Sequence, residues 1–292
     1  MKPVWTVLAA LLTAPAAVGA QDAAEPPPIV VEAEKAPDER ALSALARELA
    51  GHPRDRRPLA RFEQPLCLMV ASGDAELGRE VAERIIENAR AAKVPVRGKG
   101  CKPNALLAFS DDAQAQLRDI RKSGRRLFAG LSAREMDAAM GARDPVYVFQ
   151  ASRETSATGP GIVASPEAKG SDGIPGPVNQ VFSMGRLKRE TREDMLAVLV
   201  VIDNAAIEGL SPLQIADYAS LRLLAPTGEV DMAEAGTPRT IMTLFASPER
   251  APAAMTRFDR AYLTSLYRMP AGAFASEVLR VAMRETVAET KE

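Results

Sequence analysis

The chain of 292 residues has little of the chemistry that hydrolases and metalloenzymes commonly use, with one histidine, His52, and two cysteines, Cys67 and Cys101. A single histidine excludes a His-Glu-x-x-His zinc site, which needs two imidazoles. The sequence also contains no Gly-x-Ser-x-Gly elbow, no Ser-x-x-Lys motif and no Gly-Lys-Ser/Thr phosphate loop. The serine hydrolases and nucleotide-binding proteins that these motifs mark are therefore not indicated.

A net positive charge is missing, and aromatic side chains are scarce. The formal net charge is −1, and aromatic residues make up 4% of the chain. A nucleic-acid-binding surface needs basic residues to neutralise phosphates, and single-strand binding uses aromatic side chains on which bases stack. We therefore expect no nucleic-acid partner.

Long apolar runs are missing, apart from a short one at the N-terminus. Lys2 precedes an apolar stretch from Val4 to Leu12, and small residues follow as far as Ala20. This pattern is typical of a secretory signal peptide over residues 1–20, cleaved after Ala20, because such a short stretch does not span a bilayer. We expect an exported protein whose mature chain has no transmembrane segment.

Two cysteines in a chain predicted to enter an oxidising compartment favour a disulfide between Cys67 and Cys101. A metal site is the alternative, but one histidine and two cysteines supply few soft ligands for it. Closing this loop of about 34 residues contributes about 3–4 kcal/mol to stability on the chain-entropy model. We expect no bound metal and no cofactor.

Hydrophobic patterning predicts an α/β domain organised around residues 193–225. Met195 to Ile202 is an unbroken apolar run typical of a buried strand, and Ser211 to Gln214 combines a serine cap, a proline and a glutamine as at a helix start. Upstream, strand, helix and strand patterns form a parallel βαβ unit. The predicted strands are 65–71, 104–109, 145–150, 181–187 and 195–202, and the predicted helices are 75–92, 113–122, 132–141, 212–225, 255–267 and 276–290.

These elements predict a single domain with a mixed, mostly parallel sheet of about four or five strands, flanking helices and a helical C-terminal part. An α+β fold is the alternative. Residues 21–61 are expected to be a flexible linker rich in Pro, Ala and Glu with a short helix, so that the globular part covers 62–292. Two exposed segments are expected inside it, an irregular loop over 152–180 and an acidic loop over 227–238.

Four aspartates are candidate catalytic residues. Asp111, Asp112 and Asp203 follow the carboxyl ends of predicted parallel strands, where α/β folds bind ligands, although aspartate there is also a common helix cap or turn residue. Asp217 lies in the middle of the predicted 212–225 helix among apolar neighbours, where a carboxylate either points outward or finds a partner. A narrow polar stripe with Gln214 and Ser220 is the structural alternative for Asp217.

Four segments resemble exported proteobacterial proteins of unknown function: FEQPLC (62–67), GCKPNALLAFSDD (100–112), QIADYASLRLLA (214–225) and MTRFDRAYLTSLYRMPA (255–271). This resemblance implies a periplasmic location and no known activity. A fainter likeness connects the last two segments to a zincin-like family of unknown function, whose corresponding helix carries His and Glu. Here that helix reads Ala216-Asp217-Tyr218, so the likeness implies a version without the metal.

The sequence favours a binding or interaction module without catalytic chemistry, acting on a periplasmic protein or envelope component through the 152–180 and 227–238 segments. The alternatives are a hydrolase-like enzyme that uses Asp111, Asp112 or Asp203, with or without a divalent cation, and an inactive zincin-like pseudoenzyme.

Overall fold

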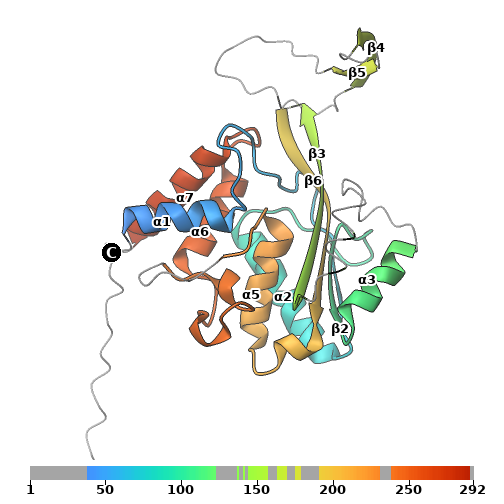
Figure 1. Cartoon of the computed structure of the whole chain (residues 1–292), viewed down its shortest axis with the longest axis vertical. Coiled ribbons are helices and arrows are strands. Elements are labelled where there is room, and N and C mark those ends of the chain that lie inside the picture. The colour runs from blue at the N-terminus through green and yellow to red at the C-terminus, as the bar shows by residue number, and fades with distance from the viewer. Residues whose placement is uncertain are drawn as a thin grey trace, which may run out of the picture. The chain divides into compact units, whose positions relative to one another are not determined.

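The computed structural model describes residues 38–122, 137, 141, 144–156, 191–230 and 238–289, and the backbone alone of 163–169 and 175–178 (Figure 1). The predicted signal peptide, the strand predicted over 181–187 and most of the 227–238 loop lie outside these residues. Of the helix predicted over 132–141, only Asp137 and Gly141 are described, both as helical. Among the described residues, no helix has the length and apolar character needed to cross a membrane.

A four-stranded mixed sheet forms the centre of the fold, which confirms the α/β prediction. Its strands are β1 (Leu68–Ala71), β2 (Ala105–Ser110), β6 (Thr191–Asp203) and β3 (Val146–Ser156), in the spatial order β1-β2-β6-β3. The first three are mutually parallel, and β3 pairs with β6 in the antiparallel sense. The βαβ unit predicted from the first two strands is therefore present.

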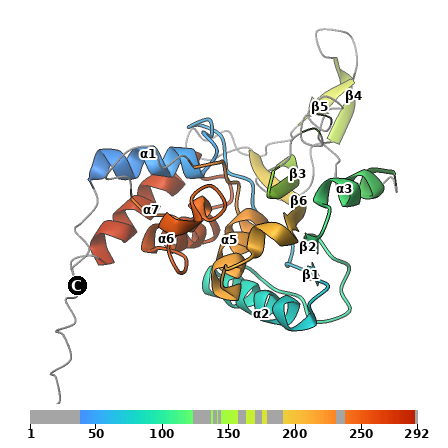
Figure 2. The same cartoon turned by 60° about the horizontal axis from the view of Figure 1, so that its bottom comes forward.

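Helices cover both faces of this sheet, as Figure 2 shows in a view close to the strand ends. On one face lie α2 (Ala75–Ala91) and α5 (Pro212–Leu224), and on the other lies α3 (Ala113–Lys122). Each begins where the sequence predicts: Asp74 caps α2, and Ser211 and Gln214 form a reciprocal capping box at the start of α5.

Burial on both faces explains the unbroken apolar run of β6. Val198, Val200 and Ile202 belong to the large core beneath α2 and α5, whereas Leu199 and Val201 pack in a smaller cluster beneath α3. Alternate residues of a strand point to opposite faces, so a strand covered twice must be apolar at every position.

The helical part that the sequence predicts at the C-terminus is α6 (Arg257–Arg268) and α7 (Ala275–Glu289). Three short 3-10 helices lie before and between the longer ones, namely η2 (Asn204–Ile207), η3 (Ile241–Thr243) and η4 (Pro248–Arg250). Helix α1 (Glu39–Leu49) packs against α7. Its residues Leu42, Leu45 and Leu49 are buried in the main core, so the folded part begins well before the predicted start near Phe62.

The prediction of an irregular loop over 152–180 is wrong for the residues of this range that the structure describes. Strand β3 continues to Ser156, and β4 (Val163–Lys169) pairs with β5 (Pro175–Val178) in the antiparallel sense. The end of β3 escaped prediction because it is polar, but it pairs with Thr191–Asp194 beyond a β-bulge at Ala151/Ser152. Backbone pairing with β6, and not apolar patterning, makes it a strand.

The predicted disulfide is confirmed: Cys67 and Cys101 are bonded, with their Cα atoms 6.0 Å apart. It ties the residue just before β1 to the loop that leads into β2. Asn104 supports the same corner, because its Oδ1 accepts a hydrogen bond of 2.7 Å from the Cys67 amide and its Nδ2 donates to the Pro65 carbonyl. The amino ends of these two strands are therefore held both covalently and by hydrogen bonds.

Candidate functional site: an open sheet edge beside an acidic depression

Among the residues that the structure describes, strand β3 forms one edge of the sheet, and its pairing shows which of its backbone groups face outward. The Asp203 amide donates a hydrogen bond to the Pro145 carbonyl, so these two residues are opposite each other at a hydrogen-bonded position of the ladder. In an antiparallel pair such positions alternate along the strand, so Tyr147 and Phe149 also direct their backbone groups at β6. The amides and carbonyls of Val146, Val148 and Gln150 therefore point away from the sheet.

A groove of about 340 Å³ runs along this outward edge. Strand β3 forms one wall, and the end of α5 with the segment after it forms the other. The volume lies at the low end of the range of roughly 300–1,000 Å³ found for ligand pockets. The lining residues are Asp144, Val146, Tyr147, Val148, Phe149, Gln150, Arg222, Thr227 and Glu229.

Gln150 anchors the edge strand to α5. Its side-chain amide nitrogen, Nε2, donates hydrogen bonds of 2.9 Å to the carbonyls of Arg222 and Ala225 at the end of that helix. The last carbonyls of a helix have no partner within it, so this side chain satisfies two groups that would otherwise need water. The groove wall is thereby fixed relative to the sheet.

Arg222 holds the opposite wall in place. Its side chain is only 4% exposed, and the guanidinium carbon lies 5.2 Å from the centre of the Tyr218 ring. Among the described residues, Glu229 is the carboxylate that pairs with it, at 2.6 Å. Further bonds go to the Tyr218 hydroxyl, to Thr227 and to the Gly228 carbonyl. Burial by itself would lower the pKa of Arg222, but Tyr218 and Glu229 raise it overall, so the guanidinium stays charged.

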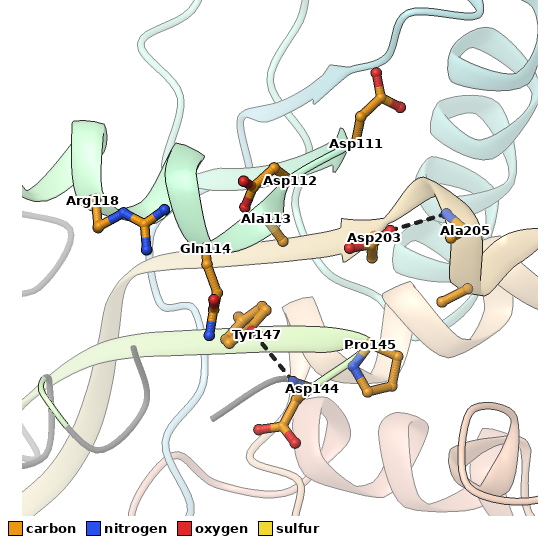
Figure 3. Close-up of a pocket in the computed structure, with 11 residues that line it drawn as sticks. Asp111, Asp112, Ala113, Gln114, Arg118, Asp144, Pro145, Tyr147, Asp203 and Ala205 are labelled. Carbon is orange, nitrogen blue, oxygen red and sulfur yellow. Dashed lines mark hydrogen bonds between the residues drawn. The ribbon is translucent and has the colours of Figure 1, made fainter. Parts of the chain in front are cut away.

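A second depression, of about 670 Å³, lies at the carboxyl ends of β2 and β6. It shares two lining residues with the groove, Asp144 and Tyr147. Three of the four predicted aspartates meet here, as Figure 3 shows: Asp111, Asp112 and Asp203. Arg118 of α3 is the cation among the residues that line it.

Each of these three aspartates also has a local structural role. The Asp112 carboxylate accepts a 2.8 Å bond from the Ala115 amide at the start of α3, and Asp203 accepts one of 3.0 Å from the Ala205 amide at the start of η2. Asp111 accepts a 2.6 Å bond from the side chain of Asn204. Capping and turn formation thus explain Asp112 and Asp203, and the bond to Asn204 explains Asp111, without a substrate.

The described residues of the depression do not form a cluster of metal ligands. Within the part of the chain that the structure describes, no group of three or more His, Cys, Asp or Glu side chains could hold a metal ion. In Figure 3 the Asp111 and Asp144 carboxylates point to opposite sides of the depression, so the carboxylates do not converge on one point. What the site offers is negative charge beside the open strand edge.

Asp217, the fourth candidate, lies apart from both depressions and is fully buried. It accepts bonds from Arg84 (2.7 and 3.3 Å), from Asn88 (2.8 Å) and from the Met255 amide (2.7 Å). Asn88 connects Asp217 with Ser220, the expected partner in the polar stripe, because its Nδ2 donates to the Asp217 carboxylate and to the Ser220 hydroxyl. Asp217 therefore joins α2, α5 and the start of the α6 region and has no exposed oxygen for chemistry.

The open edge of β3 was not among the sites that the sequence predicts. The strand itself is predicted over 145–150, and the 227–238 loop is predicted as a contact surface, but no pattern indicates that the two border one groove. That proximity depends on the packing of α5 against the sheet. The available signal was the strand's position, because an antiparallel strand added to a parallel sheet is commonly an edge strand.

Comparison of the chain with protein-family models, with curated proteins and with solved structures gives no match in any of the three.

Proposed function

We propose that the chain is an exported binding module that holds an extended polypeptide segment of another periplasmic or envelope protein against the open edge of β3. The observation that carries this proposal is the row of outward backbone groups at Val146, Val148 and Gln150, bordered by a groove. An extended segment can add to such an edge as a further strand, with main-chain hydrogen bonds providing affinity.

The groove supports binding because both of its walls are fixed. Gln150 holds the strand to the end of α5, and Arg222 holds residues 227–229 through several hydrogen bonds. A preformed site loses less conformational entropy when it binds than one that must be ordered first. Val146 and Val148 also pack against the main core, so the edge is part of the rigid sheet.

Export is part of the same proposal. It is supported by the N-terminal pattern of residues 1–20 and by the Cys67–Cys101 disulfide, since disulfides persist mainly in oxidising compartments. Mass spectrometry of protein isolated from expressing cells tests it. We expect a mature chain that begins at Gln21 and lacks free thiols, and a chain that retains Met1 in full would contradict export with cleavage.

A variant of the edge strand tests the binding site. The Val148 amide points away from β6, so Val148→Pro removes an outward donor without removing a ladder bond, as prolines at sheet edges do. Val148→Ala is the matched control, because it loses similar packing but keeps the amide. The probe is a capped peptide of about eight residues that alternates valine and threonine around a central norleucine, a length usual for strands.

We expect the probe to bind the unmodified protein and Val148→Ala with similar affinity, and Val148→Pro about tenfold more weakly, as for the loss of one strong hydrogen bond. Binding is measured by fluorescence anisotropy, with circular dichroism to verify that each variant folds. In addition, the Val148 and Gln150 amides should exchange with solvent faster than those of Tyr147 and Phe149, and the probe should slow them. Equal binding to the proline and alanine variants would refute the edge site.

A second proposal is hydrolase-like chemistry in the strand-end depression. It is favoured by one observation, the meeting of Asp111, Asp112 and Asp203 at the carboxyl ends of β2 and β6. Metal analysis of the purified protein and a screen with ester, phosphoester and peptide substrates test it, followed by Asp203→Asn on any activity found. An activity that is unchanged in Asp203→Asn would exclude this residue as a catalytic group.

A further inference from the structure

We infer that the segment held on β3 carries a lysine or arginine where it passes Glu229. This inference rests on the proposed binding function and adds the chemistry of the bound segment. Glu229 borders the groove opposite β3, and its side chain is 87% exposed. A basic side chain on a strand added to β3 would lie in this groove and could pair with the Glu229 carboxylate.

Glu229 keeps capacity for a second cation although it already contacts Arg222. Arg222 reaches one of its oxygens, Oε1, through Nη2 at 2.6 Å. Nε of Arg222 donates to the Tyr218 hydroxyl, and Nη1 donates to Thr227 and to the Gly228 carbonyl. A carboxylate has about four lone-pair positions on two oxygens, so the exposed oxygen of Glu229 can accept from a ligand.

The surroundings of the groove strengthen the same preference. Asp144 is exposed just before β3, and among the described residues no ion pair engages its carboxylate. The adjoining depression adds Asp111, Asp112 and Asp203, with Arg118 as the cation among its lining residues. Exposed charges act over a Debye length of about 8 Å at physiological salt, so this negative field extends into the neighbouring groove.

A second copy of this chain is a poorer occupant than a basic segment. In a two-fold dimer that joins two β3 edges, the same surface of each copy faces the other. The acidic borders of both grooves, including Asp144 and Glu229, would then be brought together. Like charges placed opposite each other oppose association, whereas a basic segment neutralises them.

The test compares three forms of the valine–threonine peptide that differ only at the central residue, which is lysine, norleucine or glutamate. Surface ion pairs contribute modestly, so we expect the lysine form to bind about three- to fivefold more tightly than the norleucine form at low salt, and the glutamate form to bind most weakly. Raising the salt concentration should reduce the advantage of lysine, because salt screens exposed charges.

Glu229→Gln should abolish most of the advantage of the lysine form while leaving the affinity for the norleucine form unchanged, since glutamine can still accept from Arg222. Glu249→Gln is the matched control, because it removes one exposed negative charge from η4, away from the lining residues. Equal affinities for the three peptides, with Val148→Pro still weakening binding, would overturn the preference for a basic residue alone. Failure of all three peptides to bind would overturn the edge site as well.

Discussion

Asp217 and the aspartates of the strand-end depression are the same residue type in two different environments. Asp217 is fully buried and accepts four hydrogen bonds from α2 and from the Met255 amide. Asp112 and Asp203 lie at the surface and accept bonds from amides two or three residues away in sequence. The difference teaches that neighbouring elements, and not the local sequence, decide whether a carboxylate is part of the core or remains at the solvent.

The largest effect should come from breaking the buried side of this comparison. Asp217→Ala leaves the Met255 amide buried without an acceptor, removes one of the two acceptors of the Asn88 side-chain amide, and leaves Arg84 without its main partner. Loss of one member of a buried ion pair commonly costs about 3–5 kcal/mol, and Arg84 can still contact Glu87, so we expect about 3 kcal/mol. Urea unfolding measured by circular dichroism provides the free energy of unfolding.

Asp217→Asn is the matched control for this prediction. It keeps the shape of the side chain and one acceptor oxygen but removes the charge, so it should be destabilising by less than Asp217→Ala. If both variants unfold at the urea concentration of the unmodified protein, Asp217 is not the structural residue that its contacts indicate.

A smaller effect is expected on the exposed side of the comparison. Asp112→Ala removes the side-chain acceptor at the start of α3, and losses of such caps cost about 1 kcal/mol. Asp112→Asn should restore most of this stability, because asparagine is an equally good cap. A loss as large as that of Asp217→Ala, measured by the same urea unfolding, would show that the depression is not the weakly coupled region that its exposure indicates.

The smallest effect should be a pH dependence that separates buried from exposed carboxylates. Asp259 is fully buried in the capping box of α6, where burial raises its pKa above the ordinary 3.8 despite bonds from Thr240, Ile241 and Thr256. The folded state then binds more protons than the unfolded state above pH 3.8. Its contribution is therefore fullest in acid and is lost as pH rises through the raised pKa.

Asp259→Asn removes this titration but keeps an acceptor for the two amides and a donor for Thr240. The free energy of unfolding of the unmodified protein, minus that of Asp259→Asn, should therefore fall as the pH rises above 3.8. Urea titrations at a series of increasing pH values measure the difference. A difference that rises with pH would mean that hydrogen bonds to the ionised carboxylate outweigh its burial.

The sequence predicted the elements that depend on local patterning, including β6, α2, α3 and α5 with their caps. It missed the polar end of β3, because Ser152 to Ser156 has no apolar alternation and becomes a strand only through pairing with β6. It also placed α1 in a linker, because a helix of 11 residues cannot show from its own sequence that Leu42, Leu45 and Leu49 have a core to enter. Both errors concern contacts between distant segments.

The same distinction applies to the candidate sites. The sequence alone favoured the disulfide, since it contains two cysteines and no third, and it predicted that Asp111, Asp112 and Asp203 follow strands. Only the tertiary structure decided that these three meet in one depression, that Asp217 is buried against Arg84, and that residues 227–229 border the open edge of β3. Local signals depend on neighbouring residues along the chain, whereas a groove between β3 and α5 exists only once segments about 75 residues apart have packed together.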